Sequence, residues 1–402
     1  MIKLAFRNIF RHKGRTALTL AAIVSGVAAL VLSGGFVEDI FVQLREATIH
    51  SQLGHLQIYR TGYYQYGSKS PYKYVIDRPA ELLKLVGANP KVHEAMARLG
   101  FSGILNNGRS DVAILGEGVE PDREARLGTL ITITAGRQLR DGDTHGILLG
   151  EGVARATGLK PGDRATLLLN TAEGALNSVD FDVKGVFRSF SKDYDARAVR
   201  VPLLAAQELL ATNSVNAIVL SLKATEYTDV VEQDLRNTLD SRQYEIKTWH
   251  DLADFYDKTV ALYQRQFAVL QIIILIAVLL SVLNSVNMSI FERTGEFGTL
   301  MALGNRSGTI FRLVMVENML LGLLGSGMGV VLGVVLAWTI SAVGLPMPPP
   351  PNSNSGYNAV IRVVPSMILG AFLIGFFATL LAALIPARRV TRIPVVEALR
   401  QN

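Results

Sequence analysis

Cysteine is absent from the 402-residue sequence, which excludes disulfide bonds and thiolate metal sites but does not indicate a compartment. A GxxxxGK loop is also absent, which excludes nucleotide hydrolysis by that route. Residues 116–118 and 150–152 both read GEG and lack the rest of a dinucleotide-binding fingerprint. An HExxH zinc motif and a Ser–His–Asp signature are missing too. We therefore predict that the chain is not an enzyme and holds no cofactor or metal of its own.

Charged residues are scarce, at 18% of the chain, while 49% of the residues are hydrophobic. This composition is apolar for a soluble protein of such length. A membrane-spanning helix needs roughly 20 consecutive apolar residues. The runs that satisfy this, and that we predict to be transmembrane helices, are 16–37, 267–291, 313–344 and 363–385. The first run is too long for the core of a signal peptide and no clear cleavage site follows it, so we expect it to be retained.

Arginine and lysine gather at particular ends of these runs. They cluster before the first run, between the second and third, and after the fourth. The positive-inside rule therefore predicts that both termini and the bridge at 292–312 face the cytoplasm, and that 38–266 and the loop at 345–362 lie on the opposite side. The net charge of +6 is then explained by flanks that suit an anionic inner leaflet, with no need for a nucleic acid.

Both ends of the chain are predicted to be cytoplasmic segments. Residues 1–15 form an amphipathic pattern in which Lys3, Arg7 and Arg11 recur every four residues on one face. Such a helix is expected to lie in the membrane surface. A basic flank that only sets the orientation is the alternative. Residues 386–402 are predicted to be a basic cytoplasmic tail.

The long segment at 38–266 is predicted to be two stalk helices that carry a folded domain. A helical pattern continues to Gln52 and stops at Gly54, and a second pattern at 249–266 runs into the next apolar run without Gly or Pro. Between them lie roughly 200 residues, enough for one or two hydrophobic cores. Strand-like pieces such as 103–105 and 146–149 alternate with helix-like pieces, which indicates an α+β domain.

The polar bridge between the second and third runs begins ERTGEFGTLMALG at 292–304. A short polar bridge between two spans is where a membrane protein can meet a cytoplasmic partner. One helical face carries Glu292, Arg293 and Glu296, and another carries Phe297, Leu300, Met301 and Leu303. Amphipathicity alone is equally compatible with an ordinary loop. The loop at 345–362 contains four consecutive prolines, which favour a stiff polyproline II segment.

The third run contains glycines at i+4 spacing, Gly325, Gly329 and Gly333. Small residues let membrane helices approach closely, so we predict that this face packs on another span. Glu317 lies near the start of the same run. There its carboxylate can reach the interface, and the helix N-terminus favours a negative charge. We interpret it as positional rather than as a proton carrier.

The second run has a face on which polar side chains recur. Its members are Ser281, Asn284, Ser285 and Met288. Polar groups inside a membrane need a partner across a helix interface. That partner is either another helix of the same chain or a second subunit, and the sequence leaves both open.

Several segments resemble the FtsX-like permeases of ABC transporters. LAFRNIFRHKGRTALTL at 4–20 resembles their opening, ERTGEFGTLMALGNRSGTIFRLVMVENMLLGLLGSGMG at 292–329 their coupling segment and third span, and IPARRVTRIPVVEALR at 385–400 their tail. ILLGEGVARATGLKPGDRATLLL and FDVKGVFRSF are similar to the MacB-like periplasmic core domain. GHLQIYRTGYY at 54–64 resembles most the lipoprotein-releasing, LolC/LolE-like branch. Phe297 departs from the aliphatic residue that is usual there.

The resemblance implies a type VII ABC transporter permease in a bacterial inner membrane. Such permeases form a dimer, with a second copy or a paralogue, that binds two ATPase subunits. ATP-driven closure of the ATPases acts through the coupling helix and moves the stalks and external domains. The residues that we expect to contact the ATPase are Glu292, Arg293, Glu296, Phe297, Leu300 and Met301. Because the chain has no ATPase motif, ATP and Mg²⁺ are expected to bind to a separate polypeptide.

The expected cargo is a lipoprotein, or another lipidated or hydrophobic molecule, released from the inner membrane with the help of a periplasmic carrier. Efflux of a small molecule or peptide with a periplasmic adaptor is the close alternative. Regulation of cell-wall hydrolases is a second alternative, against which the large external domain argues.

Overall fold

The computed structural model describes residues 7, 13–67, 73–127, 130–171, 173–349 and 356–391. The chain divides into two compact units, which are considered separately. The helical unit comprises Met1–Val42, Val260–Met347 and Asn358–Asn402, and the α/β unit comprises Gln43–Thr259 and Pro348–Tyr357. Most of the predicted amphipathic helix at 1–15, the end of the tail and the four prolines with the residues after them lie wholly or partly outside the described residues.

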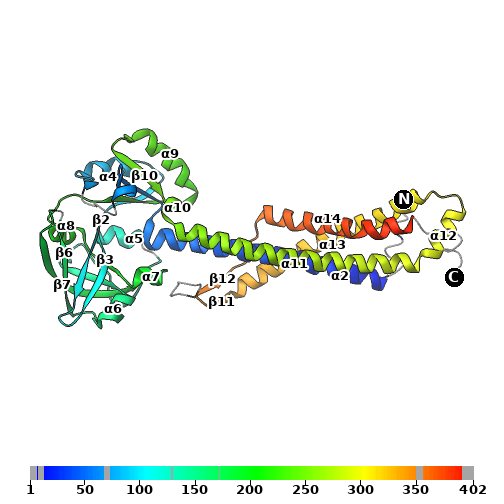
Figure 1. Cartoon of the computed structure of the whole chain (residues 1–402), viewed down its shortest axis with the longest axis horizontal. Helices are drawn as coiled ribbons and strands as arrows, with labels where there is room; N and C mark the ends of the chain where they lie inside the picture. The colour runs from blue at the N-terminus through cyan, green and yellow to red at the C-terminus, as the bar shows by residue number, and fades with distance from the viewer. Residues whose placement is uncertain are drawn as a thin grey trace. The chain divides into compact units, whose positions relative to one another are not determined.

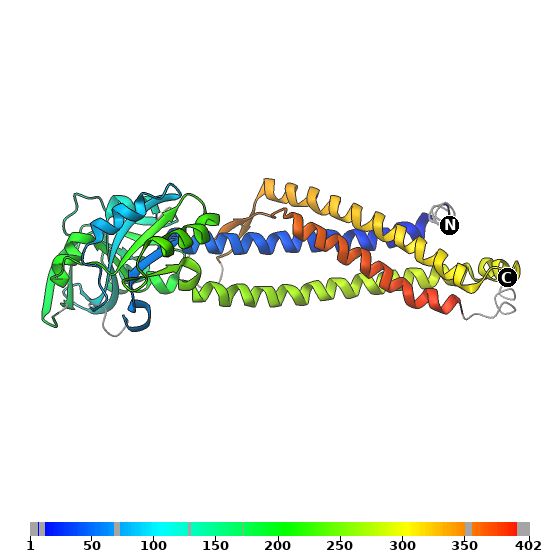
Figure 2. The same ribbon diagram turned by 90° about the horizontal axis from the view of Figure 1, so that it is seen from above.

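Within the described residues, four helices are long and apolar enough to cross a membrane (Figures 1 and 2). They are α2 (Lys13–Thr48), α11 (Asp254–Glu292), α13 (Ser307–Val343) and α14 (Pro365–Val390). The α/β domain is inserted between α2 and α11, as the predicted fold class requires. α13 begins at Ser307 rather than at 313, and α14 ends at Val390 rather than at 385, because a helix continues into polar residues that hydropathy does not count.

Helix α2 packs closely on α13 through small residues. Its branched side chains Ile23, Val27 and Val31 face Gly325, Gly329 and Gly333 of α13. A Cβ atom built on Gly329 would lie 2.7 Å from the Cβ of Val27, so only glycine fits without a shift. On the other side, Val27 also faces Gly375 of α14. The branched side chains of α2 thus fill the space that the glycines of α13 and α14 leave open. Small residues stabilise helix pairs in lipid by allowing such a close approach.

The segment that precedes α14 is fixed to α2 by polar contacts. The carboxylate of Asp39, which is 2% exposed, accepts hydrogen bonds from Arg362 Nε at 3.0 Å and from the Val360 N–H at 3.1 Å. The carbonyl oxygen of Gly35 accepts the Arg362 N–H at 3.1 Å. Ser341 Oγ of α13 accepts a backbone N–H from the same segment at 2.9 Å. α2, α13 and α14 are therefore tied together by both packing and hydrogen bonds.

We expect Gly329→Val to lower the stability of the helical unit by about 1–3 kcal/mol, the usual effect of overpacking. The matched control is Gly327→Val, since a Cβ atom at Gly327 would meet no described atom within 4 Å. Thermal unfolding of the detergent-purified chain measures both variants. Equal melting temperatures for the two would contradict the close approach of α2 and α13.

The α/β unit is built on a ten-stranded sheet in the described residues, with the order β10-β1-β9-β2-β3-β8-β5-β7-β4 and with β6 paired to β2 and β7 (Figure 1). The strands are β1 (Leu56–Arg60), β2 (Val92–Asn106), β3 (Asp111–Val119), β4 (Thr132–Gly136), β5 (Gly146–Gly150), β6 (Arg164–Asn170), β7 (Leu176–Arg188), β8 (Ala198–Pro202), β9 (Ala217–Leu222) and β10 (Tyr244–Thr248). A separate pair consists of β11 (Leu345–Met347) and β12 (Tyr357–Ala359). Antiparallel pairs predominate, with β3/β8 and β5/β7 parallel.

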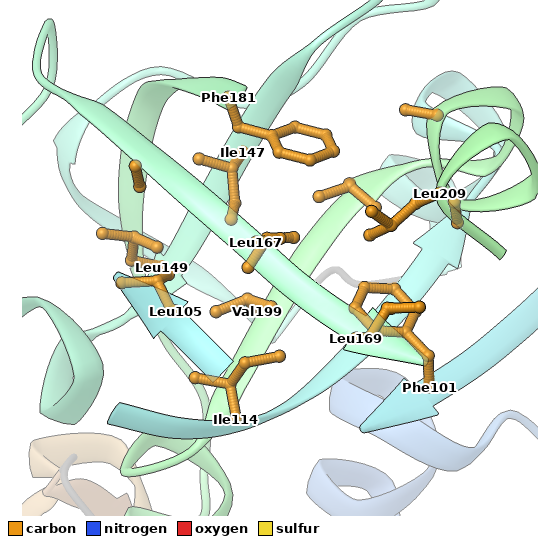
Figure 3. Close-up of a cluster of buried hydrophobic side chains, with 14 of the residues drawn as sticks. Phe101, Leu105, Ile114, Ile147, Leu149, Leu167, Leu169, Phe181, Val199 and Leu209 are labelled. Carbon is orange, nitrogen blue, oxygen red and sulfur yellow. The ribbon is translucent and has the colours of Figure 1, made fainter. Parts of the chain in front are cut away.

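Short helices cover the sheet and complete two cores. They are α3 (Tyr63–Tyr66), α4 (Pro79–Gly87), α5 (Pro121–Leu127), α6 (Glu151–Thr157), α7 (Lys192–Asp195), α8 (Leu203–Leu210), α9 (Thr228–Thr238) and α10 (Trp249–Leu252). One core includes Phe101, Leu167 and Phe181 (Figure 3), and the other includes Ile58 and Val231. The long strand β2 contributes to both cores, so it joins the two halves of the unit.

The two predicted stalk helices enter the α/β unit differently from the prediction. α2 ends at Thr48 and continues as a π-helical turn, η1 (Ile49–Leu53), which Gly54 terminates with φ of 69°. The predicted continuous helix over 249–266 is interrupted at Ala253, between α10 and α11. A side-chain cap at the start of α10, from Thr248 to the Asp251 N–H, favours a separate short helix there.

His55 follows the π-helical turn and is buried. Its Nδ1 accepts the Leu222 N–H at 3.1 Å, so the ring proton lies on Nε2, which is 3.2 Å from Thr225 Oγ1. Burial, together with the nearby His50, lowers the pKa of His55 to about 4, although Glu46 raises it. The imidazole is therefore neutral in the folded chain at neutral pH.

This histidine predicts an acid-dependent loss of stability. The unfolded chain binds a proton at His55 below pH 6.5, whereas the folded chain does not until about pH 4, so stability falls as the pH drops through this window, by about 3 kcal/mol in total. Urea unfolding followed by Trp249 fluorescence, in a Trp338→Phe background, measures it. His55→Gln should remove this part of the pH dependence, and the exposed His93→Gln should retain it. A profile shared by all three chains would refute the assignment.

Candidate functional site

A short helix, α12 (Thr294–Ala302), lies in the bridge between α11 and α13. Arg293 separates it from α11 with a non-helical ψ of 10°. At its other end Gly304, with φ of 90°, donates its N–H to Met301 O at 3.0 Å, and the Asn305 N–H donates to Leu300 O at 3.1 Å. These two bonds form a Schellman motif, which ends a helix at a glycine. α12 is thus a defined helix with its own start and end, and it joins two membrane helices directly.

A buried ion pair fixes the start of α12 to α13. Arg293 Nη1 donates to Glu317 Oε2 at 2.7 Å, and Arg293 Nη2 donates to Glu317 Oε1 at 3.2 Å. Both side chains are about one-tenth exposed, with values of 9% and 10%. The guanidinium also lies over the ring of Phe297, 5.0 Å from its centroid, and is 3.3 Å from Glu296. A paired, planar arrangement of this kind is the one that suits a guanidinium away from water.

The six residues predicted to contact an ATPase fall into three groups by their burial. Arg293 and Phe297 are turned into the helical unit, and Phe297 is only 2% exposed. Leu300 and Met301 are half-buried against the same hydrophobic cluster. The exposed members are Glu292 and Glu296. Contact with an ATPase stays a prediction for all six.

The sequence analysis placed Leu303 on the apolar face with Phe297, but the structure leaves Leu303 77% exposed, directly after the end of α12. We call Glu292, Glu296 and Leu303 the outer face of α12. The buried side chains beneath it hold α12 in place, so the outer face is presented by a fixed helix.

The polar face predicted on α11 is also divided. The Ser285 hydroxyl contacts the hydroxyl of Thr19 on α2, which is a contact within the chain. Ser281, Asn284 and Met288 are exposed. A role of this face in a subunit interface stays a prediction, and Ser285 already has a partner without one.

The pairing of Arg293 with Glu317 was missed by the sequence analysis, which explained Glu317 by its position alone. The two residues are 24 positions apart. A signal for the pairing was available in the sequence. Arg293 and Glu317 carry opposite charges, and each lies near the edge of an apolar run, on either side of the bridge. Charges at such places rarely remain unpaired.

Comparison with known proteins identifies the family of the chain. Residues 268–395 match the model of the FtsX-like permease C-terminal region, and residues 16–238 match the model of the MacB-like periplasmic core domain. The chain belongs to the FtsX-like ABC transporter permeases with a MacB-like periplasmic core domain. It is accordingly a permease subunit of a type VII ABC transporter and a multi-pass membrane protein with a large extracytoplasmic domain.

Relatives of several kinds align with this permease. An uncharacterized ABC transporter permease of Methanocaldococcus jannaschii is 22% identical, and the alignment covers 100% of the present chain and 97% of that relative. The macrolide export ATP-binding/permease protein MacB of Salmonella typhimurium is 24% identical over the whole chain, which spans 60% of that protein. The lipoprotein-releasing system transmembrane protein LolC of Xylella fastidiosa is 24% identical over 64% of each chain. These relatives favour no single branch.

The solved structure of the periplasmic region of MacB from Actinobacillus actinomycetemcomitans is also similar, with 12% identity and a TM-score of 0.38. The matched region covers 52% of the present chain and 94% of that structure.

Arg293→Ala should destabilise the helical unit by about 3–5 kcal/mol, because it leaves Glu317 buried without its partner. The exchange Arg293→Glu with Glu317→Arg should recover part of that loss. Thermal unfolding of the purified chain measures both, with the exposed Arg306→Ala as the control. Equal melting temperatures for Arg293→Ala and for the control would show that the ion pair does not hold α12.

Proposed function

We propose that the outer face of α12 is the docking surface for the ATPase, and that the chain transmits the closure of two ATPase subunits to its membrane helices. The observation that carries the proposal is the placement of α12. It is joined to α11 through Arg293 alone, bound to α13 by the ion pair, and exposed on its other side. A force applied to α12 therefore reaches two membrane helices.

The buried part of the site explains how this force would pass into the unit. The bidentate ion pair resists sliding of α12 along α13, because both of its hydrogen bonds would break together. α13 in turn packs on α2 through the glycine face and on α14. In this proposal α12 and the ends of the four membrane helices on the same side face the cytoplasm, and the α/β unit is periplasmic. ATP and Mg²⁺ bind to the partner ATPases.

Release of a lipoprotein, or of another lipidated or hydrophobic cargo, is the transport reaction that we propose. The likeness of residues 54–64 to the lipoprotein-releasing branch and the alignment with LolC support it. The alignment of the whole chain with MacB supports efflux with a periplasmic adaptor as the second candidate. Mass spectrometry of the purified complex separates the two: bound lipoproteins or a lipoprotein carrier favour release, and a bound adaptor favours efflux. Regulation of cell-wall hydrolases would instead give neither, with a hydrolase or its activator bound.

Leu303→Asp and Glu296→Lys should each abolish co-purification of the ATPase while the chain still inserts into the membrane. The first puts a charge where an apolar contact is proposed, and the second reverses a charge on the outer face. Pull-down from membranes followed by an ATPase assay measures the effect. The matched control is Leu204→Asp, since Leu204 is 78% exposed, as Leu303 is 77% exposed, but lies in the α/β unit. ATPase binding at the wild-type level in both variants would show that the enzyme docks elsewhere.

A further inference from the structure

The end of the first stalk is held in the α/β unit by side-chain hydrogen bonds. The last carbonyl groups of a helix have no donors within the helix. Here three successive carbonyls accept side-chain hydrogen bonds: Ser51 O from Arg200 Nη2 at 3.3 Å, Gln52 O from Arg98 Nη1, and Leu53 O from Gln57 Nε2 at 2.7 Å. Arginine at this end also complements the negative end of the helix dipole.

The two arginines belong to a buried cluster of four charges, which we call the socket. Arg98, from β2, makes a bidentate pair with Glu124 of α5. Arg200, from β8, lies 3.3 Å from Glu124 and 3.1 Å from Glu117 of β3. The Tyr194 hydroxyl donates to Glu117 at 2.9 Å. Five strands and helices with distant sequence positions, β2, β3, β8, α5 and α7, thus meet around the π-helical turn.

The charges of the socket balance and stabilise one another. Burial alone would raise the pKa of Glu124, yet Arg98 and Arg200 hold it below its usual value. Burial would lower the pKa of Arg200, but Tyr194, Glu117 and Glu124 raise it. Glu124 and Arg200 therefore stay ionised, and the guanidinium groups keep fixed positions because several of their N–H groups are already bonded.

A second contact holds the stalk one turn earlier. Thr225, in η3 (Thr225–Tyr227), donates its hydroxyl to Glu46 Oε1 of α2 at 3.1 Å and also contacts His55 Nε2. Around Ala253, where the second stalk is interrupted, the contacts are of another kind: the Tyr64 hydroxyl donates to Asp251 O at 3.2 Å, and the ring of Tyr256 packs on Trp249. The first stalk is therefore fixed at its end, and the second is joined through a break.

We propose that the socket is a rigid joint through which displacement of the first stalk enters the α/β unit, with Arg98 and Arg200 as positioning residues for force transmission. This inference rests on the proposed mechanical function. A helix that ended in water would bend at its last turn when pulled. Two bonds from the charged cluster, to the carbonyls of Ser51 and Gln52, and one from Gln57 to the next carbonyl prevent that bending, so the end of the stalk and the sheet move together.

The test is the double variant Arg98→Lys/Arg200→Lys, which keeps both charges but replaces each fork with a single nitrogen that cannot reach glutamate and carbonyl together. Hydrogen exchange in the full chain should then accelerate about tenfold in the peptide that covers residues 49–54, the effect of losing a charged hydrogen bond. In the complex with its ATPase, cargo released per ATP hydrolysed should fall about fivefold, while the rate of hydrolysis is retained.

Two variants make the result specific. Arg188→Lys disturbs a bidentate pair with Glu151 in the same unit, at 2.9 and 2.8 Å, without touching the stalk, and should change neither readout. Adding Glu46→Cys and Thr225→Cys to the double variant and joining the two thiols with a short crosslinker should restore release. If the double variant does not fold, Arg200→Lys alone removes one carbonyl bond and is measured in the same way.

Each outcome decides a separate point. Faster exchange with unchanged release per ATP would overturn force transmission by the socket, and unchanged exchange would overturn the joint itself. If the wild-type complex binds no ATPase or moves no cargo, the proposed function is wrong, and so is the role of the socket in force transmission. The hydrogen-exchange result still decides whether the socket holds the stalk.

Discussion

The ion pair between Arg293 and Glu317 is the interaction on which the organisation of the helical unit depends. Two charges at the edge of a bilayer are tolerated because their hydrogen bonds are directed at each other. Phe297 lies inward under the guanidinium, while Glu296 of α12 and Leu303, directly after it, are exposed. One contact thus determines both how the bridge is anchored and which side of it a partner can reach.

The sequence predicted those features that are repeated locally. Apolar runs of bilayer length and the i+4 glycines of the third run each appear as a pattern within one helix, and the structure places that glycine face against α2. The pairing of Arg293 with Glu317, the contacts of Asp39 with Arg362, and the socket were not predictable in this way. Each joins residues that only the folded chain brings together, and no periodicity marks them.

Strand β2 shows why local patterns failed in the α/β unit. Only 103–105 had a clear strand pattern, yet the strand spans Val92–Asn106. Residues 95–99 are all buried, because both faces of β2 are covered where it connects the two cores. A strand buried on both faces loses the alternation of polar and apolar residues that identifies it. Its Ala, Met and Arg residues also favour a helix in isolation.

Helix α2 is fixed by different physics in each unit. In the helical unit its branched side chains fill the space left by glycines, a contact that depends on shape and works in lipid, where apolar burial gives no preference for a neighbour. In the α/β unit the carbonyls of the π-helical turn that continues α2 are bound by two buried arginines and by Gln57, and hydrogen bonds held away from water are strong and directional. Shape restrains α2 against neighbours along its length, and polar bonds restrain its end. A helix restrained in both ways can carry a displacement along its axis without losing it to bending.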